Sequence, residues 1–186
     1  MLLGTLSWAG QAPSWLEASV PNWNKAGAEP PRAPKAPSAD PRCSSQARPG
    51  VSKDDKAVKD AGWTLVGAAQ VFGGTRAFLG AAGFDGMCRP LDYQGFVFVE
   101  GQFAGTLAPT PMRARVDGSL MTLRLTSEAA LSADFARYLE QDPLCCPSRL
   151  ASVSYRLEAT PAGPLLVVGG TRVEPAPSAS RSPATR

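Results

Sequence analysis

The sequence predicts an α+β fold that consists mostly of antiparallel sheet of the β-meander type, with one or two short helices and with disordered proline-rich tails on both sides. Short runs of β-branched and aromatic residues alternate with polar residues and are separated by glycine-containing turns, which is typical of strands joined by hairpins. The chain is 44% hydrophobic, enough for a core, yet 18 glycines and 18 prolines indicate that part of its 186 residues does not pack.

Prolines gather near both ends of the chain and divide it into three segments. Because proline lacks a backbone donor and fixes φ, we expect residues 1–50 to be a Pro-rich linker and residues 175–186 to be a disordered tail. Residues 51–174 should then form a single globular domain. The apolar residues 1–10 are similar to the last part of a secretory signal. The linker is therefore expected either to include the remnant of a signal segment or to begin with a chance hydrophobic stretch.

The first elements of the predicted domain are a short helix and several strand segments. Ser52 is a suitable N-cap and Gly62 a suitable C′ residue, so the sequence predicts a helix over residues 53–61. The glycine-punctuated residues 81–87 are predicted to be a loop. Strand-like runs, with Gly73-Gly74 as a turn among them, occur at residues 63–67, 71–72 and 76–79.

The clearest element is a hairpin over residues 93–107. Its two β-rich runs flank Glu100-Gly101, a two-residue turn in which the glycine accepts a positive φ. Phe96 and Phe98 share one face of the first run, and Val97 lies on the other face. Because both faces are apolar, we expect this hairpin to be central in its sheet or covered on both sides.

Later elements follow from turn signals and periodicity. Asp117-Gly118 marks a turn before a predicted strand over residues 119–125. A second helix is predicted over residues 131–139, with an apolar face formed by Leu131, Phe135, Tyr138 and Leu139. Asp142-Pro143 ends this helix, and alternation predicts the last two strands over residues 152–158 and 164–168.

The candidate disulfide residues are Cys43, Cys88, Cys145 and Cys146, and three arrangements are open. In the first, which small exported domains favour, Cys88 bonds to Cys145 or Cys146 and Cys43 takes the remaining partner. A loop of that length contributes about 4 kcal/mol in the chain-entropy model. In the second, Cys145 bonds to Cys146. In the third, the thiolates bind a soft metal or do redox work, although the spaced C-x-x-C pairs of such sites are missing.

Composition narrows the functional classes. The chain has no histidine, which removes His-based catalytic triads and His-ligated metal sites. A net charge of +3 without basic clusters argues against nucleic-acid binding, and no apolar run is long enough to predict a membrane span. The carboxylates of Asp134, Glu140 and Asp142 could form an acid–base pair, but acidic residues near a helix end are usually only solvated. We therefore expect no catalytic residue, no cofactor and no metal ligand.

Two segments resemble the LppP/LprE lipoprotein family of bacteria. Residues 96–106 show that family's pattern of an apolar strand, a turn and a return strand that carries Gly105-Thr106, and residues 153–157 resemble its later strand. The resemblance covers roughly residues 85–160. It implies an envelope-exposed protein and brings no catalytic residues with it. Family members carry a lipidated cysteine after a signal peptide, whereas this chain has Gln11 in the nearest comparable place.

These observations together indicate a non-enzymatic, disulfide-stapled domain of the bacterial envelope. We expect it outside the cytoplasm, in the periplasm, at the cell envelope or secreted, where its partner is a cell-envelope component, a small ligand or a protein. The alternative is a thiol-dependent redox enzyme or sensor that uses Cys145-Cys146. A third reading is a cytosolic protein whose free cysteines are buried.

Overall fold

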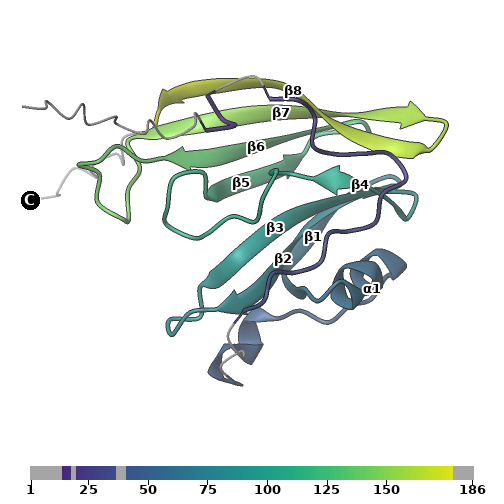
Figure 1. The fold of residues 1–186 in the computed structure, drawn as a ribbon, viewed down its shortest axis with the longest axis horizontal. Coiled ribbons are helices and arrows are strands. Elements are labelled where there is room, and N and C mark those ends of the chain that lie inside the picture. The colour runs from purple at the N-terminus through teal and green to yellow at the C-terminus, as the bar shows by residue number, and fades with distance from the viewer. Residues whose placement is uncertain (1–13, 18–19, 37–40, 178–186) are drawn as a thin grey trace, which may run out of the picture.

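The computed structural model describes residues 14–17, 20–36 and 41–177, and these form two four-stranded antiparallel sheets in two layers (Figure 1). The first sheet has the order β1-β2-β3-β4, with bounds Thr64–Phe72, Thr75–Phe84, Pro90–Val99 and Gln102–Thr106. The second has the order β5-β6-β7-β8, with bounds Leu120–Leu125, Ala130–Arg137, Arg149–Thr160 and Gly163–Pro175. Each sheet is a meander, so the prediction of a mostly antiparallel fold with few short helices is confirmed.

The main core lies between the two sheets. The buried side chains of Val97 from the first sheet and of Phe135 and Tyr155 from the second sheet meet there. Two tyrosine hydroxyls join the layers: Tyr155 donates to the Leu107 carbonyl at 2.6 Å, and Tyr93 accepts from the backbone N–H of residue 120 at 2.8 Å. Burial raises the pKa of Tyr93 to about 12, so this hydroxyl stays protonated at neutral pH.

The helix α1, which spans Lys53–Asp60, lies against the outer face of the first sheet (Figure 1). A second core lies between this helix and the sheet. Val58 from the helix packs there on Phe78, Phe96 and Phe98. The alternation of the hairpin thus places Phe96 in the outer core and Val97 in the inner core, each with no exposed surface. The prediction that this hairpin is covered on both sides is confirmed, and its turn forms at Glu100 and Gly101 with φ of 49° and 75°.

The predicted first helix is confirmed together with its caps. The Ser52 hydroxyl accepts from the Asp55 backbone, and the Asp55 carboxylate reaches back to Ser52, which satisfies two donors at the helix start. Arg48 donates to the same carboxylate at 2.6 Å. Burial by itself would raise the pKa of Asp55, but the hydrogen bonds from Arg48 and from the Val51 backbone hold it well below its usual range. The helix therefore starts on an ionised, fully partnered carboxylate.

The predicted second helix, over residues 131–139, is wrong, because residues 131–137 belong to strand β6 and residues 138–139 begin the loop after it. Leu131, Ala133 and Phe135 are buried while the side chains between them are partly exposed, which is the period of a strand. Strand β6 pairs with β5 on one side and β7 on the other, so its backbone groups bond to neighbouring strands and not within a helical turn. Leu131 and Phe135 are four residues apart, a spacing that fits one face of a helix and one face of a strand.

The predicted loop over residues 81–87 is too long. Strand β2 continues to Phe84 and pairs with β3 as far as Pro90. Gly86 lies in a turn as expected, but Gly80, just before this run, allows close packing within β2: a Cβ atom there would lie 3.0 Å from Trp63 and 3.1 Å from Phe96. The chain leaves the sheet only at residues 85–89.

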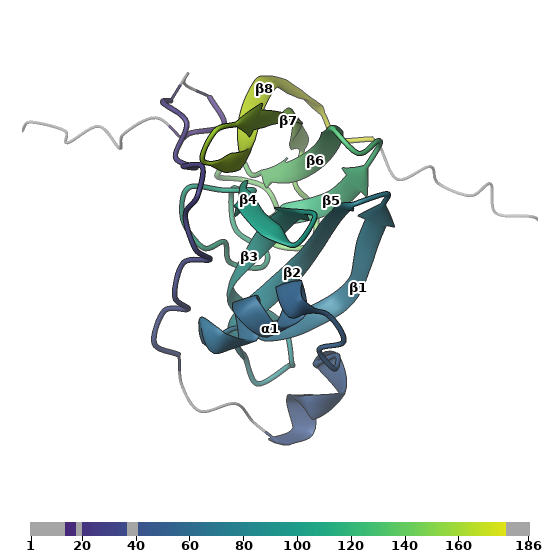
Figure 2. The same cartoon turned by 90° about the vertical axis from the view of Figure 1, so that its right-hand side faces the viewer.

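The N-terminal segment differs from the expectation of a solvated linker in the part that the structure describes. Leu16 is 2% exposed in the main core, and the Trp15 ring stands edge-on to Trp23 and to Phe135, with centroids 5.2 and 5.1 Å apart. Figure 2 shows this segment passing along the side of the molecule where β4 and β8 lie. Composition misses this packing because a few apolar side chains in an extended, proline-rich chain carry no periodic signal. The expected signal remnant, residues 1–10, lies outside the described residues, as does most of the expected tail.

Asn24 closes the seam between the edges of the two sheets. Its amide oxygen accepts from the Thr106 backbone N–H at 2.8 Å, and its amide nitrogen donates to the carbonyls of Thr106 and Leu166, at 3.1 and 3.2 Å. Thr106 ends β4 and Leu166 lies in β8, so one buried side chain joins both layers. Gly105 makes room for it: its φ is +152°, and a Cβ atom there would overlap the Asn24 amide.

Replacing Asn24 by alanine is expected to lower the free energy of unfolding by about 1–3 kcal/mol, because the buried Thr106 N–H loses its partner. Urea denaturation followed by fluorescence measures the change. The control is Asn22→Ala. Asn22 is exposed, donates to the Leu166 carbonyl at 3.1 Å and accepts from the Asn24 backbone N–H at 3.3 Å, and the loss of such exposed bonds should matter less. Equal effects of the two substitutions would show that the seam does not depend on Asn24.

Candidate functional site

The first disulfide joins Cys43 to Cys88, with 5.1 Å between their Cα atoms. Cys43 is 1% exposed and lies in a 3₁₀ helix, η1, which spans Pro41–Gln46. Cys88 lies between β2 and β3 with φ of 59°, in a turn where Arg89 donates to the Asp85 carboxylate at 2.6 Å. The bond thus fastens the N-terminal segment to the first sheet.

The preferred pairing of Cys88 with Cys145 or Cys146 is therefore corrected. Cys145 and Cys146 bond to each other, 3.7 Å apart at Cα, in the loop between β6 and β7 of the second sheet. Cys88 lies next to the first sheet and bonds to Cys43. Cys43 belongs to residues 1–50, which composition predicts to be only a linker. No free cysteine occurs among the described residues.

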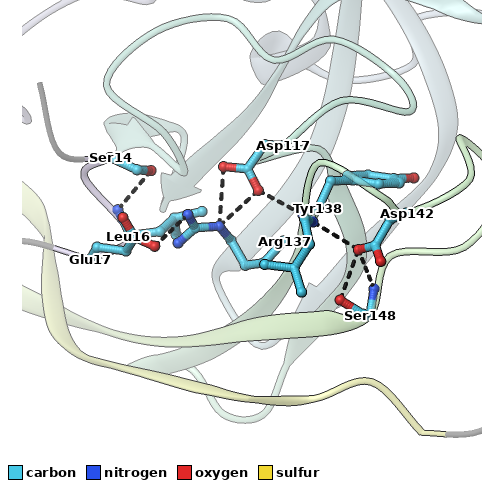
Figure 3. Close-up of polar contacts among 9 residues, drawn as sticks. Ser14, Leu16, Glu17, Asp117, Arg137, Tyr138, Asp142 and Ser148 are labelled. Atoms are coloured by element: carbon cyan, nitrogen blue, oxygen red, sulfur yellow. Dashed lines mark hydrogen bonds and ion pairs between the residues drawn. The ribbon is translucent and has the colours of Figure 1, made fainter. Parts of the chain in front are cut away.

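The loop that carries the vicinal disulfide is folded around Asp142 (Figure 3). One carboxylate oxygen of Asp142 accepts from the backbone N–H of Leu139 at 2.8 Å, the backbone N–H of Ser148 at 2.9 Å and the Ser148 hydroxyl at 2.8 Å. The backbone hydrogen bonds from Leu139 and Ser148 lower the pKa of Asp142. These bonds tie the two ends of the loop together and leave Cys145 and Cys146 exposed at its tip.

The base of this loop rests on a buried arginine (Figure 3). Arg137 is 5% exposed and donates to Asp117 at 2.9 Å and to Glu17 at 2.7 Å. Asp117 also accepts from the Tyr138 backbone N–H at 2.8 Å, and the Tyr138 hydroxyl donates to the Leu144 carbonyl at 3.0 Å. Arg137 and Tyr138 thus hold the loop in place from its first residue.

The remaining carboxylates named from the sequence have structural partners or lie in solvent. Asp134 pairs with Arg124 at 2.9 Å and accepts from the Ser152 hydroxyl at 2.7 Å, which supports neighbouring strands. Glu140 is exposed. The carboxylates of Asp134 and Asp142 therefore have structural roles and that of Glu140 is solvated. This arrangement favours the structural interpretation of the three residues over an acid–base pair.

A cleft of about 460 Å³ opens at the opposite end of the sandwich, where turns of both sheets meet. In Figure 1 the β7–β8 turn marks this end on the right. The wall of the cleft is formed on one side by residues of the first sheet and its turns, namely Gly74, Thr75, Val99, Glu100 and Gln102. On the other side it is formed by residues of the second sheet and its turns, namely Glu128, Ala129, Leu157, Glu158, Ala159, Thr160, Gly163 and Pro164. We refer to these residues as the end cleft. Sequence reasoning missed it because each wall residue belongs to a turn or strand end that looks ordinary by itself.

The end cleft combines an apolar lining with free carboxylates. Val99, Leu157 and Pro164 supply apolar surface. The carboxylates of Glu100 and Glu128 are exposed and have no ion-pair partner within the described part of the chain.

The Gly73-Gly74 turn lets both carboxylates approach. A Cβ atom on Gly73 would overlap the carboxylate of Glu128, and one on Gly74 would overlap that of Glu100. The glycines that the sequence marks as a turn therefore also shape the mouth of the cleft.

The threonine hydroxyls in the end cleft already donate hydrogen bonds to backbone carbonyls. Thr75 donates to the Glu128 carbonyl at 2.7 Å, which ties the two sheets together at the cleft mouth. Thr160 donates to the Gly163 carbonyl at 2.7 Å within the β7–β8 turn. Glu158 is paired with Arg156 at 2.7 Å. The free polar groups that face a ligand are thus mainly the carboxylates of Glu100 and Glu128, which can bind a cation.

The fold and these sites define a disulfide-bonded antiparallel β-sandwich with an open cleft at one end. Residues 75–160 match the family model described as LppP/LprE lipoprotein, so over this span the resemblance seen in the sequence is confirmed. The match runs from the start of β2 to the end of β7 and includes the central hairpin, Gly105-Thr106 and the loop with the vicinal disulfide. No curated protein and no solved structure matches the chain.

None of the helices within the described residues is both long enough and apolar enough to span a bilayer.

Proposed function

We propose that this protein is a non-enzymatic binding module of the bacterial envelope that holds a small ligand in the end cleft. The match to a lipoprotein family supports an extracytoplasmic location. The disulfides support it as well, because such bonds persist mainly in oxidising compartments.

The observation that carries the proposal is the end cleft itself. Its volume of about 460 Å³ is typical of small-molecule sites, which span about 300–1,000 Å³. Apolar wall residues bind by excluding water, while Glu100 and Glu128 favour a positive charge at the mouth. The ligand class that fits is a compact apolar body that carries an amine or guanidine. The hydroxyls of Thr75 and Thr160 already donate to carbonyls, so they support the walls of the cleft, which favours a binding role.

Titration with hexylammonium, observed through backbone amide NMR shifts, tests this function. The shifts should concentrate on residues of the end cleft, and hexanol and hexanoate, which have the same alkyl length, should bind more weakly. Glu100→Gln and Glu128→Gln should each weaken hexylammonium binding by about two- to fivefold, as expected for exposed ion pairs. The matched control is Glu174→Gln, because Glu174 lies outside the cleft and pairs with Arg172 at 3.1 Å.

Two results of this titration would contradict the proposed function. If hexylammonium, hexanol and hexanoate shift the same amides to the same extent, the carboxylates do not select the ligand. If no amide of the end cleft shifts at all, the cleft is not the binding site and the proposal fails.

A further inference from the structure

The two disulfides differ in what they do for the fold. Cys43–Cys88 joins residues 45 positions apart and fastens the N-terminal segment to the first sheet. Cys145–Cys146 joins neighbours in the chain and encloses no intervening residue. In the chain-entropy account a cross-link stabilises by restricting the unfolded loop that it closes, so a bond between neighbours restricts almost nothing. Stability therefore does not explain the second bond.

The two disulfides also differ in access. Cys43 is 1% exposed and Cys88 is partly buried, so a solvent thiolate reaches that bond less easily than a bond between two exposed residues. Cys145 and Cys146 are both exposed, and Leu144 beside them is 68% exposed. Exchange requires a thiolate to reach one sulfur of the bond, and exposed disulfides are the ones that react.

The loop does not need its disulfide to keep its shape. Its anchors are the Asp142 carboxylate, the bond from the Tyr138 hydroxyl to the Leu144 carbonyl, and a 2.9 Å backbone bond from Cys146 to the Pro143 carbonyl. None of these bonds uses a sulfur atom. After reduction the two thiols should stay side by side, so that a disulfide oxidant can re-form the bond between them by taking up two electrons and two protons.

From these three properties we infer that Cys145–Cys146 is a redox-active disulfide that exchanges two electrons with a dithiol reductant. A thiolate of the reductant attacks one sulfur, the Cys145–Cys146 bond breaks, and the released thiolate takes a proton. The second thiol of the reductant, as a thiolate, then attacks the mixed disulfide and frees the other cysteine, which is also protonated. The protein gains two electrons and two protons, and the reductant leaves as a disulfide.

This activity is independent of the binding function proposed for the end cleft. The loop precedes the first residue of β7, Arg149, and the cleft contains the last, Thr160. The nearest cleft residue on this strand is Leu157, so the part of β7 between the two sites spans roughly 26 Å. Either activity can thus fail without the other.

The test is a redox titration of the full native chain in mixtures of reduced and oxidised dithiothreitol. Free thiols are alkylated at each step and located by peptide mass spectrometry. Cys145 and Cys146 should become labelled at a ratio of reduced to oxidised reagent at least tenfold lower than Cys43 and Cys88 require. The selectively reduced protein should melt at the temperature of the oxidised protein, and transfer into excess oxidised dithiothreitol should restore the bond.

The control variant is the double substitution Cys145→Ser with Cys146→Ser. It should fold, melt like the parent and show no labelling in the low-reductant range. The inference is overturned if Cys43–Cys88 is reduced first or together with the vicinal pair, or if Cys145 and Cys146 are already free thiols in the oxidised native protein. It is equally overturned if selective reduction unfolds the domain.

Discussion

Replacing both Cys43 and Cys88 by serine should lower the free energy of unfolding by about 4 kcal/mol, because the bond closes a loop of 45 positions. For a domain of this size the melting temperature should fall by roughly 8–16 °C. Thermal and urea denaturation under oxidising conditions measure the loss. The same comparison in strong reductant should show almost no difference, because the parent then lacks the bond too.

The matched control is the double serine variant at Cys145 and Cys146, which encloses no loop and should melt with the parent. If the Cys43 and Cys88 variant also melts with the parent under oxidising conditions, the N-terminal segment is not held by this disulfide in solution.

Truncation of Phe96 to alanine should cost about 3–5 kcal/mol, the range for a fully buried phenylalanine. Phe96 has no exposed surface and its ring meets those of Trp63 and Phe78, with centroids 5.3 and 6.3 Å away. Val97→Ala probes the opposite face of the same strand and should cost about 2 kcal/mol, since it removes two buried methyl groups from the inner core. Chemical denaturation of the two variants measures the packing of both faces.

The control for this pair is Phe72→Ala. Phe72 ends β1 and is 49% exposed, so the same change in side chain should cost far less there. A neutral Val97→Ala would show that the second sheet does not cover the first, and a neutral Phe96→Ala would remove the outer core beneath α1.

The sequence predicted the first helix and the central hairpin because each depends on residues that are close together in the chain. The first helix has its cap at Ser52 and its end at Gly62, which takes a φ of +94° that only glycine adopts easily. The central hairpin has Glu100-Gly101 at its turn and alternating apolar faces on its strand. Each of these features depends on neighbours within a few residues, so the sequence alone was enough to place them.

The candidate sites were only partly visible in the sequence. All four cysteines were singled out, but their pairing was not, because pairing depends on which segments meet and not on the spacing of cysteines. The end cleft was missed, because its glutamates lie on turns of different sheets and nothing in the sequence indicates that Glu100 and Glu128 share one opening. The sequence marks the glycines at positions 73 and 74 as a turn, but it does not indicate that they make room for the two carboxylates.

The sequence by itself determined the mostly antiparallel character of this protein, its first helix and its central hairpin, because capping, turn chemistry and alternation act over short distances. Tertiary structure alone decided that residues 131–137 form a strand, since pairing with β5 and β7 outweighs a spacing that suits a helix equally well. It also decided that Asn24 joins β4 to β8 and that Cys43 reaches Cys88. These contacts join segments that lie 45 to 142 positions apart, and their partners are chosen by the packing of two sheets, which no local pattern records.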